Sequence, residues 1–376
     1  MDYNPELNFI NKVLQTTLRP RVEELIKKQK TIGPLIVEFD PTTNCFFECP
    51  DCISSGQLNK GQISTSKAIE LITEFHNAGV KGLIFIGGGE PLAHPNISDL
   101  FTHAYNLGIS LGLTTNGFLI NRHILPISQL INWTRVSIDA GTQKTFEIFR
   151  PSKIKDSFVK IISNLEKLSK IKKGKLGYSY LLIERPTANG TLINNCQEIF
   201  IAAKLAKEVG CDYFEFKPMV NENHHLISFS QKAKIQIKEQ LEQSIDLNDN
   251  QFRVIYPKSV EHILFSASLD QSKSYAFCPT LELRTVVTPN GIYPCPYKRG
   301  FKQNLLGLTD TKFDEFWQSE SCQLSIKKVN PIKDCTHFCI RHELNVLLYN
   351  LARSYKEGID LLKYISVSDI NDDIFV

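Results

Sequence analysis

Between residues 35 and about 219, the chain repeats one pattern: a short apolar run, a loop, then an amphipathic segment. Runs of this length suit buried strands, and the amphipathic segments have the spacing of helices packed on one side. Strands that alternate with helices predict an α/β fold with a parallel sheet and right-handed crossovers. We expect strands at 35–40, 82–86, 110–114, 134–138, 176–183 and 213–217, and helices at 66–79, 97–108, 155–171 and 194–210.

This alternation ends near residue 219. One amphipathic segment, 230–245, predicts a further helix, while residues 277 to about 342 combine short β-rich runs, turn signals and five cysteines. We therefore expect five parts: a helical lead (1–34), an α/β domain (35–220), a connecting helical segment (221–276), a small cysteine-rich domain (277–345) and a helical tail (346–376). In parallel α/β folds, functional residues gather in the loops after the C-terminal ends of strands.

Composition and charge narrow the function classes. The 376 residues carry 43 basic and 40 acidic side chains, a net charge of +3, which does not indicate a nucleic-acid partner. No apolar run is long enough to span a membrane, and the first residues lack the order of a secretory signal. We expect a cytoplasmic protein with no membrane partner. Clustered cysteines in that compartment indicate metal or redox chemistry more often than disulfides.

The first cysteine cluster follows the first predicted strand as Cys45-x3-Cys49-x2-Cys52. Three thiolates on one short loop can hold three irons of a [4Fe–4S] cube and leave the fourth iron open. A zinc site is the alternative, but structural zinc prefers four ligands, and no histidine is close in sequence to be the fourth. The spacing favours the iron–sulfur cluster and leaves zinc open.

Further motifs follow the next strands in order: Gly88-Gly89-Glu90-Pro91, Thr115-Asn116-Gly117, Ser137-Ile138-Asp139 and then Arg150. Together with the three cysteines, this series resembles the radical S-adenosylmethionine (radical SAM) superfamily over about residues 35 to 219. The resemblance implies a partial (β/α)6 TIM-like barrel. One departure is Asp51, because the residue before the third cysteine is usually aromatic in that family.

The resemblance also implies a chemistry and roles for these residues. In the family, a reduced cluster cleaves S-adenosylmethionine (SAM) into methionine and a 5′-deoxyadenosyl radical, which removes a hydrogen atom from the substrate. An electron donor such as flavodoxin or ferredoxin is implied. Gly88, Gly89 and Glu90 would receive the SAM amine, Arg150 its carboxylate, and Ser137 and Asp139 the ribose, with Asn116 in a neighbouring SAM-binding loop. Taken alone, the glycines also suit a flexible turn, Arg150 an ion pair, and Ser137 with Asp139 a helix cap.

The second cysteine group lies near the C-terminus. Cys278 and Cys295 flank a predicted hairpin with a turn at 289–291, and Cys322, Cys335 and Cys339 follow. This segment resembles the SPASM or shorter twitch extension of radical SAM enzymes, which implies one auxiliary [4Fe–4S] cluster on Cys278, Cys295, Cys335 and Cys339. Cys322 is a competing ligand or a hydrogen-atom donor.

A zinc alternative and two further cysteines remain to be considered. Zinc held by Cys335, Cys339 and either His337 or His342 is the alternative to the auxiliary cluster. Cys196 and Cys211 are expected to be small buried residues.

Three functions remain open at this point. The first is a radical SAM enzyme that modifies a ribosomal peptide, as a maturase or epimerase, although residues 1–34 contain no recognisable peptide-binding domain. The second is a radical dehydrogenase of a small molecule such as a sugar or aminocyclitol, which the single-cluster cysteine count favours. The third is a zinc-organised binding protein. The sequence does not identify the substrate.

Overall fold

A computed structural model describes residues 9–28, 32–221, 223–265, 272–336 and 338–365. A nine-stranded sheet forms its centre, in the order β11-β10-β1-β2-β3-β4-β5-β8-β9. The six predicted strands are confirmed as β1 (Ile36–Phe39), β2 (Gly82–Phe85), β3 (Ser110–Thr115), β4 (Trp133–Ser137), β5 (Lys175–Leu182) and β8 (Tyr213–Pro218). All six pair in parallel with their neighbours, as the alternating pattern predicted.

Three more strands extend this sheet. β9 (Arg253–Ile255) pairs in parallel with β8. β10 (Arg284–Thr288) pairs in parallel with β1, and β11 (Gly291–Tyr293) returns antiparallel to β10, which confirms the predicted hairpin. We expected the cysteine-rich segment to stand apart as a small domain, whereas its hairpin shares the main sheet. As a result, the C-terminal cysteines lie beside the strand that leads to the first cysteine cluster.

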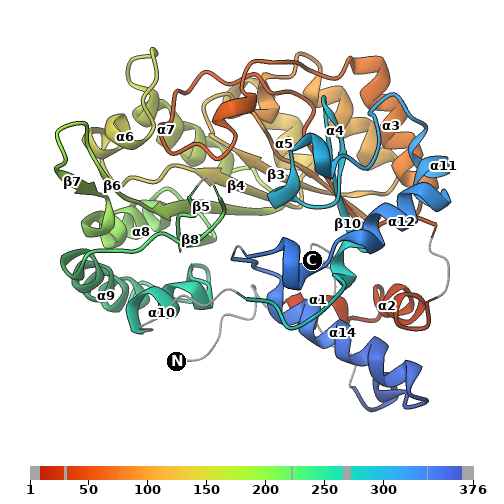
Figure 1. The fold of residues 1–376 in the computed structure, drawn as a ribbon. Coiled ribbons are helices and arrows are strands. Elements are labelled where there is room, and N and C mark those ends of the chain that lie inside the picture. Colours follow the sequence, from red (N-terminus) through yellow and green to blue (C-terminus); the bar gives the residue numbers. More distant parts are fainter. Residues whose placement is uncertain (1–8, 29–31, 222, 266–271, 337, 366–376) are drawn as a thin grey trace.

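Helices connect the parallel strands, as Figure 1 shows. The predicted helices are α3 (Thr65–Asn77), α4 (Ile97–Asn106), α7 (Ser157–Ser169), α8 (Ile199–Glu208) and α9 (Gln231–Ile245). Shorter ones were not predicted: α5 (Ile124–Leu130), α6 (Gln143–Phe149), α10 (Lys258–Phe265), α11 (Phe313–Gln318), α12 (Glu320–Lys328) and α13 (Pro331–Asp334). An antiparallel pair, β6 (Glu184–Pro186) and β7 (Leu192–Asn194), was also missed.

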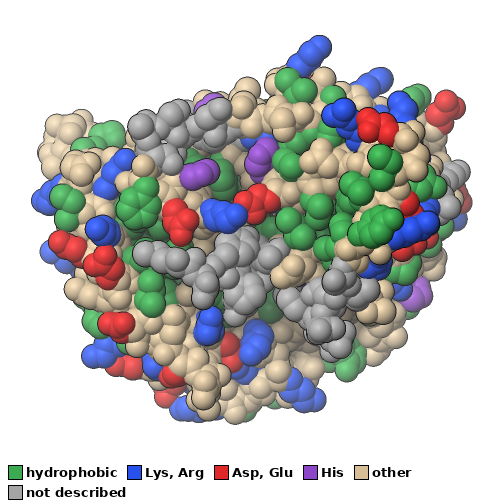
Figure 2. Space-filling view, turned by 90° about the horizontal axis from the view of Figure 1, so that it is seen from below, with side chains coloured by type: hydrophobic (Ala, Val, Ile, Leu, Met, Phe, Trp, Pro, Cys, Tyr) green, Lys and Arg blue, Asp and Glu red, His purple; other side chains and the backbone are tan. Residues whose placement is uncertain are grey.

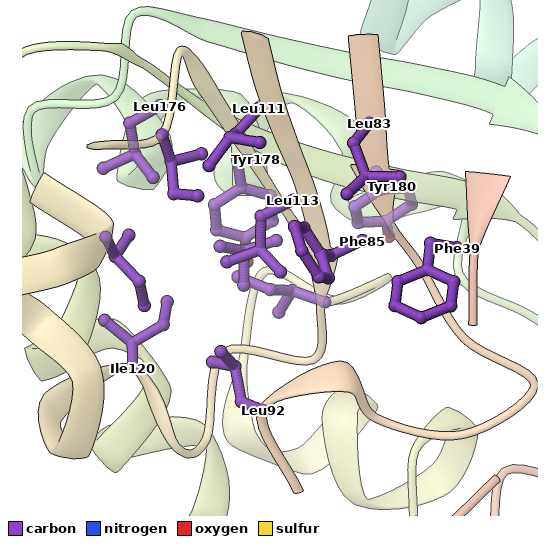
Figure 3. Close-up of a cluster of buried hydrophobic side chains, with 14 of the residues drawn as sticks. Phe39, Leu83, Phe85, Leu92, Leu111, Leu113, Ile120, Leu176, Tyr178 and Tyr180 are labelled. Carbon is purple, nitrogen blue, oxygen red and sulfur yellow. The ribbon is translucent and has the colours of Figure 1, made fainter. Parts of the chain in front are cut away.

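The two faces of the sheet are covered differently. Side chains at alternate strand positions, such as Phe39, Leu83, Phe85, Leu113 and Tyr180, form a fully buried cluster (Figure 3). Burying one such aromatic side chain stabilises the fold by about 1.5–3 kcal/mol. The intervening positions Ile36 and Ile84 pack instead against α1 (Phe9–Val13), α2 (Arg19–Ile26) and α14 (His342–Lys356), which are drawn together below the sheet in Figure 1.

These helices lie in the two terminal segments of the described chain. The helical lead contains α1 and α2, and the helical tail contains most of α14; residues 1–8, 29–31 and 366–376 lie outside the described part. Within that part, none of the helices has the length and apolar character needed to cross a membrane. On the face shown in Figure 2, basic and acidic side chains are interspersed with hydrophobic ones, so that face presents no continuous basic surface.

Candidate active site and second cysteine site

The loop after β1 carries the first three cysteines, all partly exposed and not disulfide-bonded. The Thr43 hydroxyl oxygen accepts hydrogen bonds from the backbone N–H groups of Lys60 and Gly61, each at 2.9 Å, and so closes the loop. Burial raises the pKa of the Cys49 thiol to about 11, while the nearby Arg150 guanidinium opposes this rise. The thiols of Cys45 and Cys52 are close enough to affect the pKa of Cys49. The structure therefore brings the three thiols and Arg150 to one place.

Glu90 ties the neighbouring loops to this one. Its carboxylate accepts hydrogen bonds from the Thr115 hydroxyl (2.6 Å), the Asn116 N–H (2.6 Å) and the Leu92 N–H (3.1 Å). Its own N–H donates to the Asn44 carbonyl, beside Cys45, at 2.7 Å. Burial raises the pKa of this carboxyl group. The predicted contact of Glu90 with the SAM amine stays a prediction, because the carboxylate here is held by donors of the protein itself.

Gly88 and Gly89 lie where the backbone of the β2 loop meets the cysteine loop. A Cβ atom at Gly89 would stand 2.3 Å from the Thr43 carbonyl carbon and 2.5 Å from the Asn44 oxygen, far inside normal contact. The Gly88 N–H donates to Asp40 Oδ2 at 2.5 Å. We expected these glycines to admit SAM. The close approach seen here is to the cysteine loop, which itself requires glycine at position 89.

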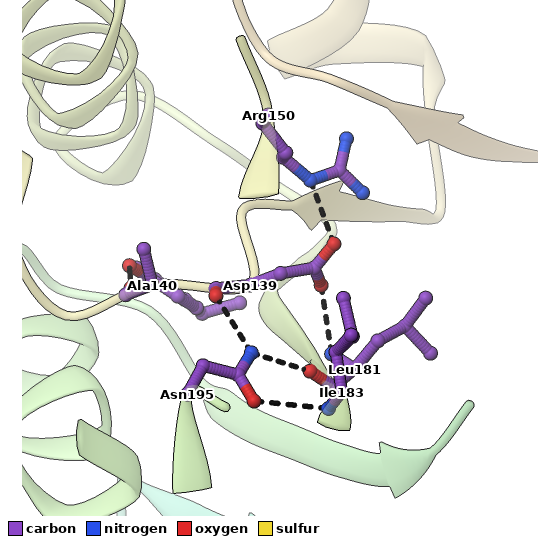
Figure 4. Close-up of polar contacts among 7 residues, drawn as sticks. Asp139, Ala140, Arg150, Leu181, Ile183 and Asn195 are labelled. Atoms are coloured by element: carbon purple, nitrogen blue, oxygen red, sulfur yellow. Dashed lines mark hydrogen bonds and ion pairs between the residues drawn. The ribbon is translucent and has the colours of Figure 1, made fainter. Parts of the chain in front are cut away.

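Asp139, which is buried, and Arg150, which is partly buried, form an ion pair at the end of β4 (Figure 4). Arg150 Nε donates to Asp139 Oδ2 at 2.7 Å, and the Leu181 N–H donates to Oδ1 at 2.7 Å. Burial lowers the pKa of Arg150, but Asp139 and the Cys49 thiolate outweigh it and hold that pKa above its usual range. The two terminal nitrogens of Arg150 point away from Asp139 (Figure 4).

Asn195, which the sequence analysis did not single out, completes this arrangement. Its Nδ2 donates to the carbonyls of Asp139 (2.9 Å) and Leu181 (2.8 Å), and its Oδ1 accepts from the Ile183 N–H at 2.9 Å (Figure 4). Asp139 itself has φ +59°, a left-handed conformation that is uncommon outside glycine. Asn195 thus fixes the turn that carries Asp139. No local sequence signal identifies it, because its partners come from two other segments.

Asn116 and Ser137 lie at the same edge of the sheet. Asn116 Oδ1 accepts from the Phe118 N–H at 3.0 Å, but Asn116 Nδ2 is buried without a hydrogen-bond partner among the described residues. A buried amide donor with no acceptor is costly, so it points to a ligand atom. Ser137 is the last residue of β4 and is partly exposed. Both positions suit contacts with a small molecule seated on these loops.

Asp51, the departure from the family pattern, has a specific partner. Arg185 Nε of β6 donates to Asp51 Oδ2 at 2.9 Å, and the Arg185 guanidinium lies 5.6 Å from the centre of the Phe149 ring. An ion pair thus connects the cysteine loop to the β6–β7 hairpin. The sequence analysis missed it, because it missed the hairpin.

Four C-terminal cysteines line one cavity: Cys278, Cys295, Cys335 and Cys339, together with Tyr275, Tyr297, Arg341 and Asn345 among others. Burial raises the pKa of the Cys278 thiol to about 12, and its Sγ lies 3.4 Å from Asn345 Oδ1 and from Thr280 Oγ1. Burial raises the pKa of the Cys339 thiol, and the nearby Arg341 guanidinium opposes this rise. The four predicted ligands therefore converge, with a cation beside them.

The remaining candidates lie elsewhere. Cys322 is fully buried in α12, within the hydrophobic core, and is not among the residues that line this cavity. Cys196 and Cys211 are buried, as expected. His342 Nδ1 lies 3.3 Å from the Tyr275 hydroxyl, and His337 is outside the described residues. Among the described residues, no group of three or more His, Cys, Asp or Glu side chains is already arranged as a metal site.

A known protein family matches the part of the chain that contains the first cysteine loop and the loops beside it. Residues 39–185 match the family model of the radical SAM superfamily. The chain contains a radical SAM domain. Such a domain implies a [4Fe–4S] cluster and SAM. The residues present fit both groups: three thiols share one loop, and near it lie the partly buried Arg150 guanidinium and the Asn116 amide, which has no hydrogen-bond partner among the described residues.

Several known proteins resemble parts of this chain. The AdoMet-dependent heme synthase of Methanosarcina barkeri is 26% identical over 186 residues, 48% of this chain and 49% of that protein. Mycofactocin maturase MftC of Mycobacterium ulcerans is 28% identical over 158 residues, 41% of each. The chain thus matches about half or less of the length of these relatives. Streptococcus suis SuiB bound to precursor peptide SuiA has a similar fold, with a TM-score of 0.61 and 15% identity over 95% of this chain and 79% of that one.

Proposed function

We propose that this protein is a radical SAM enzyme that abstracts a hydrogen atom from a peptide and carries an auxiliary [4Fe–4S] cluster in its C-terminal segment. One observation carries the first part: the three thiols of Cys45, Cys49 and Cys52 gather beside Arg150 at the ends of the parallel strands. When bound and reduced, the first cluster supplies the electron that cleaves SAM into methionine and a 5′-deoxyadenosyl radical.

Each residue of the first site has a separate task in this proposal. The three thiolates hold three irons, which leaves one iron for the amino and carboxylate groups of SAM. Arg150, fixed through Nε by Asp139, presents its two terminal nitrogens to the SAM carboxylate, a fork that matches a carboxylate well. Asn116 Nδ2 donates to a SAM oxygen, and Ser137 meets a ribose hydroxyl. The loop of Gly88, Gly89 and Glu90 receives the amine through its carbonyls.

The convergence of Cys278, Cys295, Cys335 and Cys339 on one cavity supports the auxiliary cluster. Four thiolate ligands would close that cluster to substrate. Its roles are then to accept or pass an electron and to stabilise the surrounding chain, since metal binding supplies folding free energy. Zinc at this site is the alternative, and metal analysis separates the two.

The substrate rests on the relatives. A precursor peptide is bound to the structurally similar SuiB, and MftC is a maturase by name, which supports a peptide. The heme synthase resemblance and the four auxiliary cysteines support the second candidate, a small molecule that is dehydrogenated or otherwise oxidised. A flavodoxin or ferredoxin as electron donor, and a cytoplasmic location, stay predictions.

Anaerobic incubation with SAM, dithionite and candidate precursor peptides tests this function. We expect about eight irons per chain, 5′-deoxyadenosine, and a peptide of changed mass. The triple variant Cys45→Ala/Cys49→Ala/Cys52→Ala should retain about four irons and form no 5′-deoxyadenosine. Cys335→Ala/Cys339→Ala should also retain about four irons, and its product should fall much further than its 5′-deoxyadenosine.

Cys322→Ala is the matched control for these cysteine variants, because its side chain is buried away from both cysteine sites. It should keep both iron content and product. Loss of iron in this variant would make Cys322 a ligand, and loss of product alone would make it a hydrogen-atom donor. Full 5′-deoxyadenosine formation by the triple variant would refute the first site.

A further inference from the structure

Arg299 joins the two cysteine sites. It follows Cys295 after the short turn Pro296–Lys298, and its side chain is only 10% exposed. Its Nη2 donates to the Ser54 hydroxyl at 2.6 Å, two residues beyond Cys52. Its Nη1 lies 3.6 Å from Asp40 Oδ2, just after β1. One side chain from the second site therefore contacts both ends of the loop that carries the first.

Asp40 extends this contact to the glycine loop of the SAM site. Its side chain is fully buried, and Oδ2 accepts the Gly88 N–H, while Oδ1 has no hydrogen-bond partner among the described residues. Burial raises the pKa of Asp40 to about 7, and the Arg299 guanidinium opposes that rise. A buried carboxylate with one amide donor needs a nearby cation to stay ionised. Arg299, at 3.6 Å from Asp40 Oδ2, favours that charged form and so strengthens the bond from the Gly88 N–H to Asp40.

The backbones of the two loops also meet beside this side chain. Gln57 Nε2 donates to the Arg299 carbonyl at 3.4 Å. Gly300 has φ +83°, and a Cβ atom there would stand 1.7 Å from Gln57 Nε2. The segment from Cys295 to Gly300 is thus seated on the segment from Ser54 to Gln57. A displacement of the first segment would be transmitted directly to the second.

We propose that Arg299 is a positioning residue through which the second cysteine site controls SAM binding at the first. The proposal rests on the two-cluster function given above. Metal bound at Cys295 fixes the segment that ends in Arg299, and Arg299 in turn holds Ser54 and the Asp40–Gly88 pair in place. When the second site is empty, this segment loosens and SAM binds more weakly. The arrangement limits SAM cleavage in molecules that lack the auxiliary cluster.

The first test measures SAM affinity in the reconstituted full-length Arg299→Met variant, by calorimetry and by the change that SAM causes in the electron paramagnetic resonance spectrum of the reduced first cluster. Iron content should match the parent. SAM affinity should fall by about 10-fold to 100-fold, as expected for loss of a charged hydrogen bond. The control is Lys302→Met, which removes an exposed cation two residues beyond this segment and should bind SAM like the parent. Parental SAM affinity and an unchanged spectrum in Arg299→Met would overturn the proposal.

A double-variant comparison tests the coupling itself. Cys335→Ala/Cys339→Ala should weaken SAM binding in the parent but cause little further loss in Arg299→Met. Independent, multiplying losses would overturn the proposal. If Arg299→Met fails to hold the first cluster, two milder variants replace it: Ser54→Ala and Arg299→Lys each remove only part of the contact. Normal SAM affinity in both of these variants would refute the proposal. Four irons in the parent would instead refute the two-cluster function.

Discussion

Gly89 offers the sharpest test of how the first site is built. In Gly89→Ala, the new methyl group would stand 2.3 Å from the Thr43 carbonyl carbon and 2.5 Å from the Asn44 oxygen. Carbon atoms normally pack at about 3.5–4.0 Å, so the overlap exceeds about 1 Å. These neighbours are backbone atoms and cannot rotate away. Asn44 also accepts the Glu90 N–H, so the cysteine loop must shift as a unit away from the strand-end loops.

The cost follows from this overlap. Overpacking of a rigid site destabilises a protein by about 1–3 kcal/mol, and we expect the upper end here because both partners are backbone. The shift would also move Cys45, the residue after Asn44, so the loss of iron and of SAM cleavage should exceed the loss of stability. Gly56→Ala is the matched control in the same loop. No atom lies within 4 Å of its added methyl group, and its free energy of unfolding should change by less than about 0.5 kcal/mol.

The assay compares both variants after identical anaerobic reconstitution. Iron and sulfide per chain, 5′-deoxyadenosine formation and the free energy of urea unfolding are measured for each. Gly56→Ala should behave like the parent in all three, while Gly89→Ala should be defective in all three. If Gly89→Ala retains parental iron and SAM cleavage, the close packing of the two loops does not control the site, and the reasoning is refuted.

Two further predictions follow from buried charges. Arg150→Met should weaken SAM binding by about 1.5–3 kcal/mol, because it removes the guanidinium group that Asp139 holds in place. The control Lys144→Met changes an exposed residue of α6 and should bind SAM like the parent. Equal affinities of the two variants in calorimetry would contradict this prediction. Glu215 has a pKa of about 2: burial raises it, but Lys217 and Arg135 lower it by more. A folded-state pKa below the usual 4.5 gives stability that is present above pH 4.5 and lost as the pH falls toward 2, on the order of 3 kcal/mol in total. Glu215→Gln should therefore lower the free energy of urea unfolding at pH 7 and reduce its dependence on acid pH. Glu239→Gln, which changes an exposed residue, should do neither. An unchanged acid dependence in Glu215→Gln would refute the stabilising role of the ion pairs of Glu215.

The strands were predictable because each lies in a short apolar run that is followed by a loop and an amphipathic segment. The run 134–138 became Trp133–Ser137, and 213–217 became Tyr213–Pro218. The helix expected from residue 194 begins instead at Ile199, because 192–194 pairs with 184–186. Asn189 and Gly190 form the turn of that hairpin, with φ +82° at Gly190. This turn signal was present in the sequence, but the strands beside it are only three residues long.

Contacts between distant segments could not be predicted from local patterns. β10 joins the sheet beside β1, and Arg284 pairs with Glu38 across 246 positions of sequence. Arg299 reaches Ser54 across 245 positions. Nothing in the sequence around Arg299 distinguishes it from the other basic residues of the chain. Cysteine spacing revealed the two sites because thiol chemistry is uncommon, whereas the side chains that support them are of ordinary type and acquire a role only through the fold.

The acidic residues near the site show where a motif can mislead. Glu90 and Asp139, both assigned to SAM contacts by resemblance, accept hydrogen bonds from backbone N–H groups of neighbouring loops or strands, and so does Asp40. A buried carboxylate that accepts several such bonds sets the distances between loops and is expensive to displace. Arg150 and Asn116 differ from these carboxylates. The terminal nitrogens of Arg150 point away from Asp139, and Asn116 Nδ2 has no hydrogen-bond partner among the described residues. Recognition of SAM should therefore depend directly on these two donors, and only through loop geometry on the carboxylates.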